Sequence, residues 1–509
     1  MAAAGAATDE LGGAALPRLL PRTRTAQFTW FLLFALATRW YALGDTNYHE
    51  DELLFFWFGQ RMHDGLLPYV DLWDRKPPSL FLLYYLIAGI SRSVLAYQIA
   101  GLLSVAATAQ VIALISERIG ARGVGGVLAG SIYLAMLLEF GGAGGQAAVF
   151  FNLPMALAAL LVLSRSESLA QGRTDRGLFL AMLLGGLTIS FKQTAIFEAA
   201  FLGGYALWRL SRGGMAGARL LRTALLMMLT GAAPMLAWAA FYAAVGHFGE
   251  FWHAMVLSNL AKTYNPHGDL VRRARFFAVA LAPAVLIAMA GLAWRGNNAS
   301  REAKHFVAGW LAAAFIGFVI VPNLIDHYVL PLLVPLAVAA SPFLSRRPVG
   351  WAAGVLIAGL YVTSAPALDL GRAARSRALE TTLVSELRAR DPSPRLFVYD
   401  GPVYLYTLTG SSPPTPLAFP LHLSFLPERN VSHLDTATEV RRILATRPTT
   451  VVIQRDSRPR ELYNPETLAM VEAYVRHCRT RYTRPLLDMY GPLDLDLYTQ
   501  CTGSAARTP

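Results

Sequence analysis

The sequence "NYHEDELLFFWFGQRMHDGLLPYVDLWDRKPPS", residues 47–79, has features that a plain loop between membrane helices does not need. It follows an apolar run, opens with three consecutive acids, Glu50, Asp51 and Glu52, and ends with Lys76 before two prolines. The apolar residues between these ends form one stripe, which predicts a short amphipathic helix on a membrane surface. Carboxylates are favoured in the first turn of a helix, so capping alone would also explain the acids.

The composition of the whole chain indicates a polytopic membrane protein. Of its 509 residues, 54% are hydrophobic and only 15% are charged, whereas about a quarter are charged in an average soluble domain. The net charge of +12 would suggest nucleic-acid binding in a soluble protein. Here the basic residues lie mostly in short loops between apolar runs, where they favour the cytoplasmic side of a membrane. We therefore expect no nucleic-acid partner.

The apolar runs predict a mainly α fold with about 11 to 13 transmembrane helices. The short run after Pro77, residues 78–93, is expected to be re-entrant or interfacial, with both ends outside. The other runs then make about eleven crossings, and the five basic loops named below fall on the cytoplasmic side. In the alternative path, residues 78–93 cross fully and another short pair does not.

The candidate helices are residues 27–44, 78–93, 97–116, 124–141, 147–164, 177–191, 193–210, 219–245, 273–294, 303–322, 327–344 and 349–367. The basic loops are residues 116–122, 165–177, 209–222, 295–304 and 345–348.

This path divides the chain into three parts. Residues 1–26 are expected to be a disordered cytoplasmic arm, and residues 27–368 a membrane domain whose first outer loop is residues 45–77. Residues 369–509 have ordinary charge density and short apolar runs, which predicts a small soluble α/β domain outside the cytoplasm. Its candidate helices are residues 371–390, 436–448 and 464–478, and its candidate strands are residues 395–400, 449–456 and 494–501.

The only two cysteines of the chain, Cys478 and Cys501, lie in this last part. In an oxidising compartment they could form a disulfide, and the alternative is two free thiols. The simplest role for the domain itself is that of a cap over the membrane domain.

Three basic residues elsewhere in the chain also fall at the outer surface. Lys192 ends an apolar run, where it is either a snorkelling lysine or a functional cation. Arg272 and Arg273 lie outside, against the charge rule. They either face lipid headgroups or bind an anion, because the guanidinium fork matches phosphate oxygens.

A carboxylate and a lysine held together at the outer membrane surface suit one kind of chemistry. The carboxylate can accept a proton from a hydroxyl group. The lysine can offset the charge of a lipid phosphate. Sugar transfer from a lipid phosphate needs both, and it needs no general acid because the phosphate is already a good leaving group.

Residues 49–79 resemble the first outer loop of the C-type (GT-C) glycosyltransferases that use polyprenyl-phosphate sugars. That family includes the protein O-mannosyltransferases and the bacterial lipid A aminoarabinose transferases. Its pattern is an Asp-Glu pair, a "G…P" stretch and a Lys-Pro-Pro or His-Pro-Pro motif. The stretches "GLTISFKQ" (186–193) and "HYVLPLLVP" (327–335) are similar to later elements of the family.

The resemblance implies specific roles for individual residues. Asp51 is the catalytic base, with Glu52 as the second member of the acidic pair, and Lys76 contacts the donor phosphate. His327 and Tyr328 line the donor cavity. The family's chemistry implies transfer with inversion at the anomeric carbon. Lys192, Arg272 and Arg273 are further candidates for binding the donor phosphate or lipid.

The chain departs from the family in one place. Many relatives carry a second acid after the second outer loop, where this chain reads "GGQAAVFFN" (144–152). Gln146 and Asn152 are polar but uncharged. We therefore expect metal-independent chemistry without a cofactor, in which Gln146 or Asn152 is a hydrogen-bonding partner, and a divalent metal is the alternative.

The function expected from these observations is that of a glycosyltransferase of the bacterial inner membrane. Its N-terminus would be cytoplasmic and its C-terminal domain periplasmic. A transporter or flippase of lipid-linked sugars is an alternative, although the chain shows no internal repeat of the kind that such proteins carry. A non-catalytic envelope assembly protein is another. The acceptor hydroxyl could belong to a lipid, a glycan or a protein.

Overall fold

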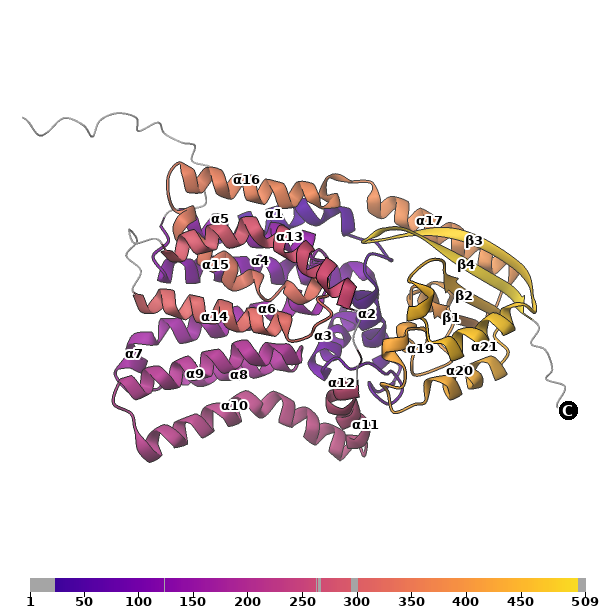
Figure 1. Cartoon of the computed structure of the whole chain (residues 1–509), viewed down its shortest axis with the longest axis horizontal. Helices are drawn as coiled ribbons and strands as arrows, with labels where there is room; N and C mark the ends of the chain where they lie inside the picture. Colours follow the sequence, from indigo (N-terminus) through magenta and orange to yellow (C-terminus); the bar gives the residue numbers. More distant parts are fainter. Residues whose placement is uncertain (1–22, 123, 262, 264–266, 294–300, 502–509) are drawn as a thin grey trace, which may run out of the picture.

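The computed structural model describes the whole chain except residues 1–22, 123, 262, 264–266, 294–300 and 502–509. Most of the predicted arm, residues 1–26, lies outside the described residues. Figure 1 shows a bundle of side-by-side helices joined at one end to a smaller α/β domain. We call the end that carries this domain the domain end and the opposite end the basic end.

Each apolar run of the sequence forms one helix. The helices of the bundle are α1 (Arg24–Arg39), α4 (Val94–Arg118), α5 (Gly125–Glu139), α6 (Ala147–Ser164), α8 (Arg176–Ile189), α9 (Ile196–Arg212), α10 (Gly217–Ala244), α13 (His267–Ala293), α14 (Arg301–Val319), α15 (Leu333–Leu344) and α16 (Val349–Ser364). Within the described residues, α4, α6, α10, α13 and α14 are long and apolar enough to cross a membrane.

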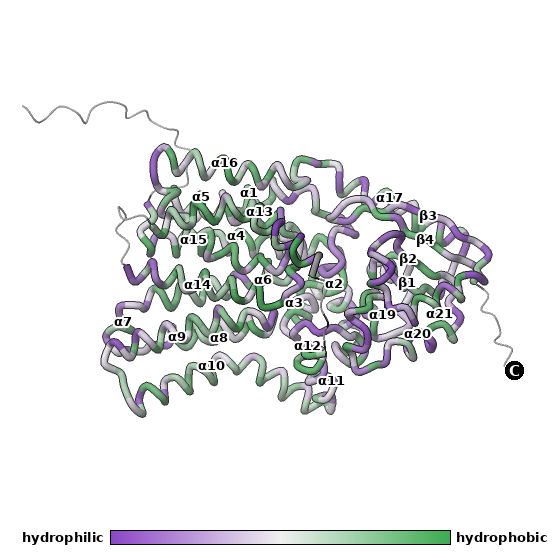
Figure 2. The backbone as a smooth tube through the Cα atoms, in the orientation of Figure 1, coloured by the Kyte–Doolittle hydropathy of each residue, from purple (hydrophilic) through white to green (hydrophobic). Residues whose placement is uncertain are grey.

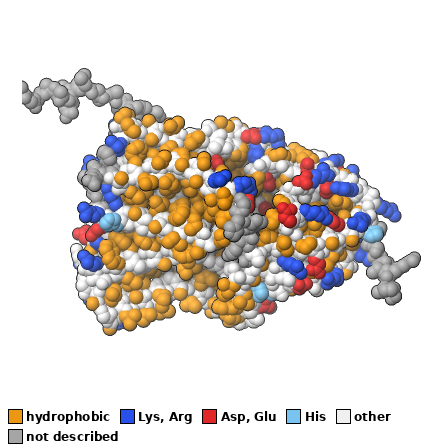
Figure 3. Space-filling view, viewed as in Figure 1, with side chains coloured by type: hydrophobic (Ala, Val, Ile, Leu, Met, Phe, Trp, Pro, Cys, Tyr) orange, Lys and Arg blue, Asp and Glu red, His pale blue; other side chains and the backbone are white. Residues whose placement is uncertain are grey.

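The surface of the bundle is suited to lipid. Large apolar side chains point outward from its helices, among them Leu229, Val279 and Leu356, which are 56%, 76% and 74% exposed. Figure 2 shows that hydrophobic residues predominate along the helices of the bundle, and Figure 3 shows an apolar surface over its body, with charged side chains at its two ends and on the α/β domain. A soluble protein rarely exposes such an extensive apolar surface. The chain is therefore a multi-pass membrane protein.

Helix ends that adjoin predicted basic loops lie together at the basic end. A salt bridge of 2.5 Å between Arg24 and Glu117 joins the start of α1 to the end of α4. Another, of 2.6 Å between Arg209 and Glu302, joins the end of α9 to the start of α14. These two contacts join helix ends that are far apart in the sequence.

Two short helices cross each other at the domain end. They are α2 (Glu50–Met62) and α3 (Pro78–Ile90). They approach so closely that a Cβ on Gly59 of α2 would lie 2.4 Å from the backbone oxygen of Tyr84. Helix α3 has 13 residues, about 20 Å at 1.5 Å per residue. Just after α3, the carbonyl of Arg92 accepts a hydrogen bond of 3.0 Å from Gln60 of α2. Both ends of α3 thus lie at the domain end, as a re-entrant segment requires.

Short helical pieces complete the membrane domain. They are α7 (Ser166–Ala170) at the basic end, and α11 (Phe248–Trp252), a π-helical turn (His253–Leu257) and α12 (Ser258–Ala261) between α10 and α13. The 3₁₀ turn η4 (Asp326–Val329) precedes α15.

The C-terminal domain contains a four-stranded mixed sheet in the order β1-β2-β4-β3. Strands β1 (Leu396–Asp400) and β2 (Thr450–Gln454) are parallel, and β4 (Gly491–Cys501) is antiparallel to both β2 and β3 (Cys478–Asp488). Its helices are α17 (Arg372–Arg390), α18 (Leu405–Thr409), α19 (Leu421–Ser424), α20 (Thr436–Ala445) and α21 (Pro465–Val475). The predicted fold class, a polytopic helical domain with a small α/β domain, is confirmed. Strand β3 was not predicted.

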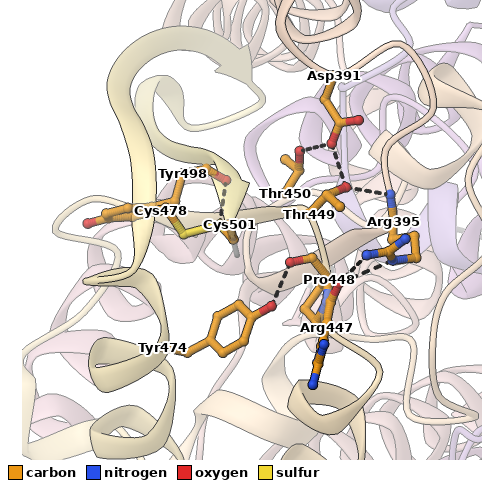
Figure 4. Close-up of a disulfide and its surroundings, with 10 residues drawn as sticks. All are labelled: Asp391, Arg395, Arg447, Pro448, Thr449, Thr450, Tyr474, Cys478, Tyr498 and Cys501. Atoms are coloured by element: carbon orange, nitrogen blue, oxygen red, sulfur yellow. Dashed lines mark hydrogen bonds between the residues drawn. A yellow bond between two sulfur atoms is a disulfide. The ribbon is translucent and has the colours of Figure 1, made fainter. Parts of the chain in front are cut away.

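A disulfide joins Cys478 and Cys501, which lie opposite each other at the open end of the β3–β4 hairpin (Figure 4). The two residues are 23 positions apart in the sequence. In a chain-entropy model, closing a loop of this size stabilises the fold by about 3 kcal/mol. Nearby, the carboxylate of Asp391 accepts hydrogen bonds from the hydroxyls of Thr449 and Thr450 at the start of β2. The disulfide and these bonds hold the far end of the hairpin, while its tip reaches the membrane domain.

Candidate active site

The first turn of α2 carries the central carboxylate of the site. His49 is the N-cap of this helix, and its Nδ1 accepts a hydrogen bond of 3.2 Å from the backbone N–H of Asp51. Gln146, just before α6, contacts His49 Nε2 at 2.9 Å and Asp51 Oδ2 at 3.5 Å. The side chain of Asp51 is 15% exposed. Capping and function therefore coexist here, because the residue that caps the helix also orients the acid.

A histidine from a distant part of the chain approaches the same carboxylate. His327, in turn η4, places Nε2 3.6 Å from Asp51 Oδ2, and its side chain is 11% exposed. Its ring lies edge-on to the ring of His49, with 5.9 Å between the centroids. The residue before it, Asp326, places its carboxylate Oδ1 3.4 Å from His327 Nδ1.

Two lysines lie on another side of Asp51. The Nζ atom of Lys76 is 5.0 Å from the ring centre of Phe55, and that of Lys192 is 3.9 Å from the ring centre of Tyr328. The backbone of Lys76 is fixed on both sides. Its N–H donates to Asp74 Oδ1 at 2.8 Å, and its carbonyl accepts from the hydroxyl of Tyr69 at 2.7 Å. The structure thus brings Lys76, Lys192, His327 and Tyr328 together around Asp51.

These charges keep Asp51 ionised. Burial by itself would raise the pKa of Asp51, but the charges of Lys76, His327, His49 and Lys192 outweigh it, so the pKa lies well below the ordinary value. Burial lowers the pKa of Lys76, while Asp74 and Asp51 raise it further, so the net shift is upward. An ionised carboxylate and a charged ammonium group therefore coexist in a mostly buried site at neutral pH.

Glu52 differs from its neighbour Asp51. Its side chain is fully buried, and burial raises its pKa to about 8. It faces the backbone N–H groups of Gly145 and Gln146 and the hydroxyl of Tyr97, although none of these reaches good hydrogen-bond geometry. Gly144 leaves room for it, because a Cβ there would lie 2.1 Å from Glu52 Oε2. Glu52 is thus largely protonated at neutral pH and is unsuited to be the base.

A large cavity of about 1180 Å³ separates the membrane domain from the C-terminal domain. Its walls include Tyr48, Asp326 and the arginines Arg272 and Arg273 from the membrane domain, and Arg458 and Tyr490 from the other side. Arg272 and Arg273 both form salt bridges with Asp269. Lys76 and Lys192 are not among the described residues that line this cavity. The predicted phosphate-binding residues therefore form two separate groups.

One predicted site residue lies elsewhere. The amide of Asn152 donates hydrogen bonds of 3.1 Å to the carbonyl of Leu330 and 3.3 Å to the hydroxyl of Tyr133. Asn152 is buried in the helix bundle, where it supports the chain just after η4. Of the two alternatives, Gln146 is the residue that contacts Asp51, because it precedes α6 whereas Asn152 lies inside that helix.

No three His, Cys, Asp or Glu side chains form a metal-binding group within the described residues. Metal-independent chemistry remains a prediction.

Three residues near Asp51 had no assigned role in the sequence analysis. They are His49, Asp326 and Tyr490. The signal for His49 was its place directly before the acidic run, and that for Asp326 was its place beside His327. Tyr490 had no local signal, because it reaches Asp326 only through the docking of the hairpin tip on the membrane domain.

Comparisons with known proteins give the fold a name. No protein-family model and no curated protein matches the chain. Among solved structures, ArnT from Cupriavidus metallidurans bound to undecaprenyl phosphate is 14% identical, with a TM-score of 0.57 over 93% of this chain and 98% of that one. The apo state of the same protein is 13% identical, with the same TM-score and coverage. The oligosaccharyltransferase of Archaeoglobus fulgidus, in complex with Zn and sulfate, is 14% identical over 77% of this chain and 58% of that one, with a TM-score of 0.42. The chain has the fold of the GT-C glycosyltransferases.

Proposed function

We propose that the protein is a membrane glycosyltransferase that moves a sugar from a polyprenyl-phosphate donor to an acceptor hydroxyl. The observation that carries the proposal is the mostly buried, ionised Asp51, surrounded by Lys76, Lys192 and His327 at one end of a membrane-helix bundle. An ionised group in such a place is costly unless it has a use. The fold supports the same conclusion, since a protein of this fold was solved with undecaprenyl phosphate bound.

The reaction assigns one task to each kind of group. Asp51 accepts the proton of the acceptor hydroxyl while the acceptor oxygen forms its bond to the anomeric carbon. The bond from that carbon to the phosphate oxygen breaks, and its electron pair leaves with the phosphate. Lys76 and Lys192 offset the negative charge on the departing phosphate. A single displacement of this kind inverts the anomeric carbon.

Arg272 and Arg273 have a separate role in the proposal. Their cavity lies beside the site, because Asp326 lines the cavity and its neighbour His327 contacts Asp51. We keep them as candidates for binding the donor phosphate or lipid as it enters. Gln146 acts as the hydrogen-bonding partner of Asp51.

We also propose an orientation in the bacterial inner membrane, with the basic end in the cytoplasm and the domain end in the periplasm. The loops rich in Arg at the basic end support this orientation. The disulfide of the C-terminal domain supports it as well, because disulfides persist in oxidising compartments.

The first experiment is a transfer assay with purified protein in lipid nanodiscs. A panel of polyprenyl-phosphate donors with radiolabelled sugars is incubated with an envelope extract, and labelled products and released polyprenyl phosphate are measured. We expect Asp51→Asn to reduce transfer by about 10²- to 10⁴-fold, the usual contribution of a general base. The control is Asp64→Asn, because Asp64 follows the same helix and is 37% exposed.

Sugar transfer by the Asp51→Asn variant at the wild-type rate would disprove the role of Asp51 as base. Movement of labelled lipid across the membrane without any sugar transfer would favour the flippase alternative.

A further inference from the structure

The tip of the β3–β4 hairpin reaches the site from the C-terminal domain. The backbone N–H of Met489 donates a hydrogen bond of 2.8 Å to the carbonyl of Tyr48, in the loop before α2. The amide of Asn47 donates to the carbonyl of Leu487 at 3.3 Å. Asp488 accepts from the backbone N–H of Tyr490 at 2.8 Å. These bonds fix the tip against the first loop of the membrane domain.

Tyr490, at the end of this tip, begins a series of contacts that leads to Asp51. Its hydroxyl donates to Asp326 Oδ2 at 2.8 Å. The other oxygen of Asp326, Oδ1, is 3.4 Å from His327 Nδ1 and also accepts from the backbone N–H of His327 at 2.8 Å. His327 Nε2 in turn lies 3.6 Å from Asp51 Oδ2. Each member of the series therefore contacts the next with a separate atom.

An imidazole has two distinct nitrogens, and the partner of one decides what the other presents. Here the carboxylate of Asp326 lies 3.4 Å from Nδ1, which makes no hydrogen bond to the described residues, and Nε2 is directed at Asp51. The carboxylate is itself held by two bonds, from Tyr490 and from the backbone. Resting on the proposed function, we propose that Asp326 and Tyr490 are positioning residues that hold His327 against Asp51, so that the C-terminal domain completes the active site.

The electrostatics of the site fit this role. Burial would raise the pKa of Asp326, but the bond to His327 and the charges of His327 and His49 outweigh it, and the pKa falls to about 2. Asp326 is therefore an anion that faces His327 Nδ1.

Other titratable groups also act on Asp51 and Asp326. Lys76, Lys192 and His49 face Asp51 together with His327, and His49 also acts on Asp326. Glu50, Glu52 and Tyr328 interact with Asp51 as well. None of these groups is changed in the test variants, so a change in the titration of Asp51 reports on Asp326 and Tyr490.

The test compares Asp326→Asn and Tyr490→Phe with wild type. The matched control is Tyr498→Phe, a tyrosine of the same hairpin whose ring lies 5.4 Å from Arg481 in the C-terminal domain. Protonation of Asp51 is followed by infrared difference spectroscopy of the protein in nanodiscs as the pH is lowered, with Asp51→Asn as the subtraction. The pH dependence of sugar transfer is measured in parallel.

We expect the midpoint for protonation of Asp51 to rise by about one pH unit in Asp326→Asn, because a His327 side chain that is no longer held leaves its place beside Asp51 and its charge no longer lowers the pKa of Asp51. Tyr490→Phe should raise it by less, and Tyr498→Phe should leave it unchanged. The acid limb of the transfer profile should move by the same amounts.

An unchanged midpoint in both Asp326→Asn and Tyr490→Phe would overturn the inference. A raised midpoint in a protein that shows no transfer at all would support the inference and count against the proposed function. Circular dichroism and gel filtration of each variant separate these results from misfolding.

Discussion

The two ends of the helix bundle use charge in different ways. At the basic end, Arg24 and Glu117 form a salt bridge in which the side chains are 55% and 43% exposed. At the domain end, His327 and Asp51 face each other with side chains that are 11% and 15% exposed. The first pair joins two helix ends in contact with solvent. The second belongs to a cluster of lysines, histidines and acids contributed by four separate segments of the chain.

This difference distinguishes charges that set the orientation of the protein in the membrane from charges that its chemistry requires. Exposed ion pairs contribute little to stability. The orientation of the protein in the membrane is therefore enough to explain the basic residues at the basic end. Burying several ionised groups costs free energy that the fold must supply elsewhere. A cluster that persists despite this cost indicates a function that requires it. The predictions below test this comparison.

The largest effect is expected from Lys76→Met. Its positive charge lowers the pKa of Asp51, and in the proposed reaction it offsets the charge of the leaving phosphate. We expect kcat/KM for the donor to fall by about 10²- to 10³-fold, as for the loss of one charge-stabilising group. The matched control is Lys304→Met in α14, near the basic end, which should leave transfer within about twofold of wild type. An equal loss of kcat/KM in Lys76→Met and Lys304→Met would show that lysines at the two ends do not differ in their importance for transfer.

Glu52→Gln tests the other member of the acidic pair. The pKa of Glu52 is about 8 in the folded protein, above the value of about 4.5 expected in an unfolded chain. The folded state therefore holds a proton between these values that the unfolded state has lost, so this group makes stability fall as the pH rises from about 4.5 to 8.

Glutamine stays neutral throughout this range. We therefore expect the thermal unfolding temperature of Glu52→Gln to decline less than that of wild type between pH 5 and pH 8. Transfer at neutral pH should stay within about threefold of wild type, because the variant has the same charge there. The same pH dependence of unfolding in both proteins would show that Glu52 is ionised in the folded state.

The smallest effect is expected at the basic end. A double-mutant cycle of Arg24→Gln and Glu117→Gln, followed by thermal unfolding, should give a coupling free energy of about 0.5 kcal/mol or less, as for other exposed pairs. Sugar transfer should be unaffected. A coupling of several kcal/mol would mean that charge at this end stabilises the fold as well as setting its orientation.

Much of the architecture could be predicted from the sequence because a membrane helix needs only a long apolar run. The region around Asp51 could also be predicted, since its acids and Lys76 lie within one short segment. Strand β3 was missed because its alternating Arg and Thr residues are only partly buried and its first residue, Cys478, closes what reads as the end of a helix.

Contacts between distant segments could not be predicted from local patterns. Asn152 was considered with Gln146 because they are close in sequence, yet α6 carries Asn152 into the bundle. Tyr490 and Asp326 are 164 positions apart, and only the docking of two domains brings them together.

The central claim is that a lipid phosphate and the carboxylate of Asp51 share one site at the domain end. A cryo-electron microscopy structure in nanodiscs with added undecaprenyl phosphate tests it most directly. The account predicts density for the phosphate in contact with Lys76 Nζ and beside Asp51, with the polyprenyl chain extending along the bundle. A phosphate bound elsewhere, with Lys76 and Asp51 in contact only with other groups of the protein, would contradict it.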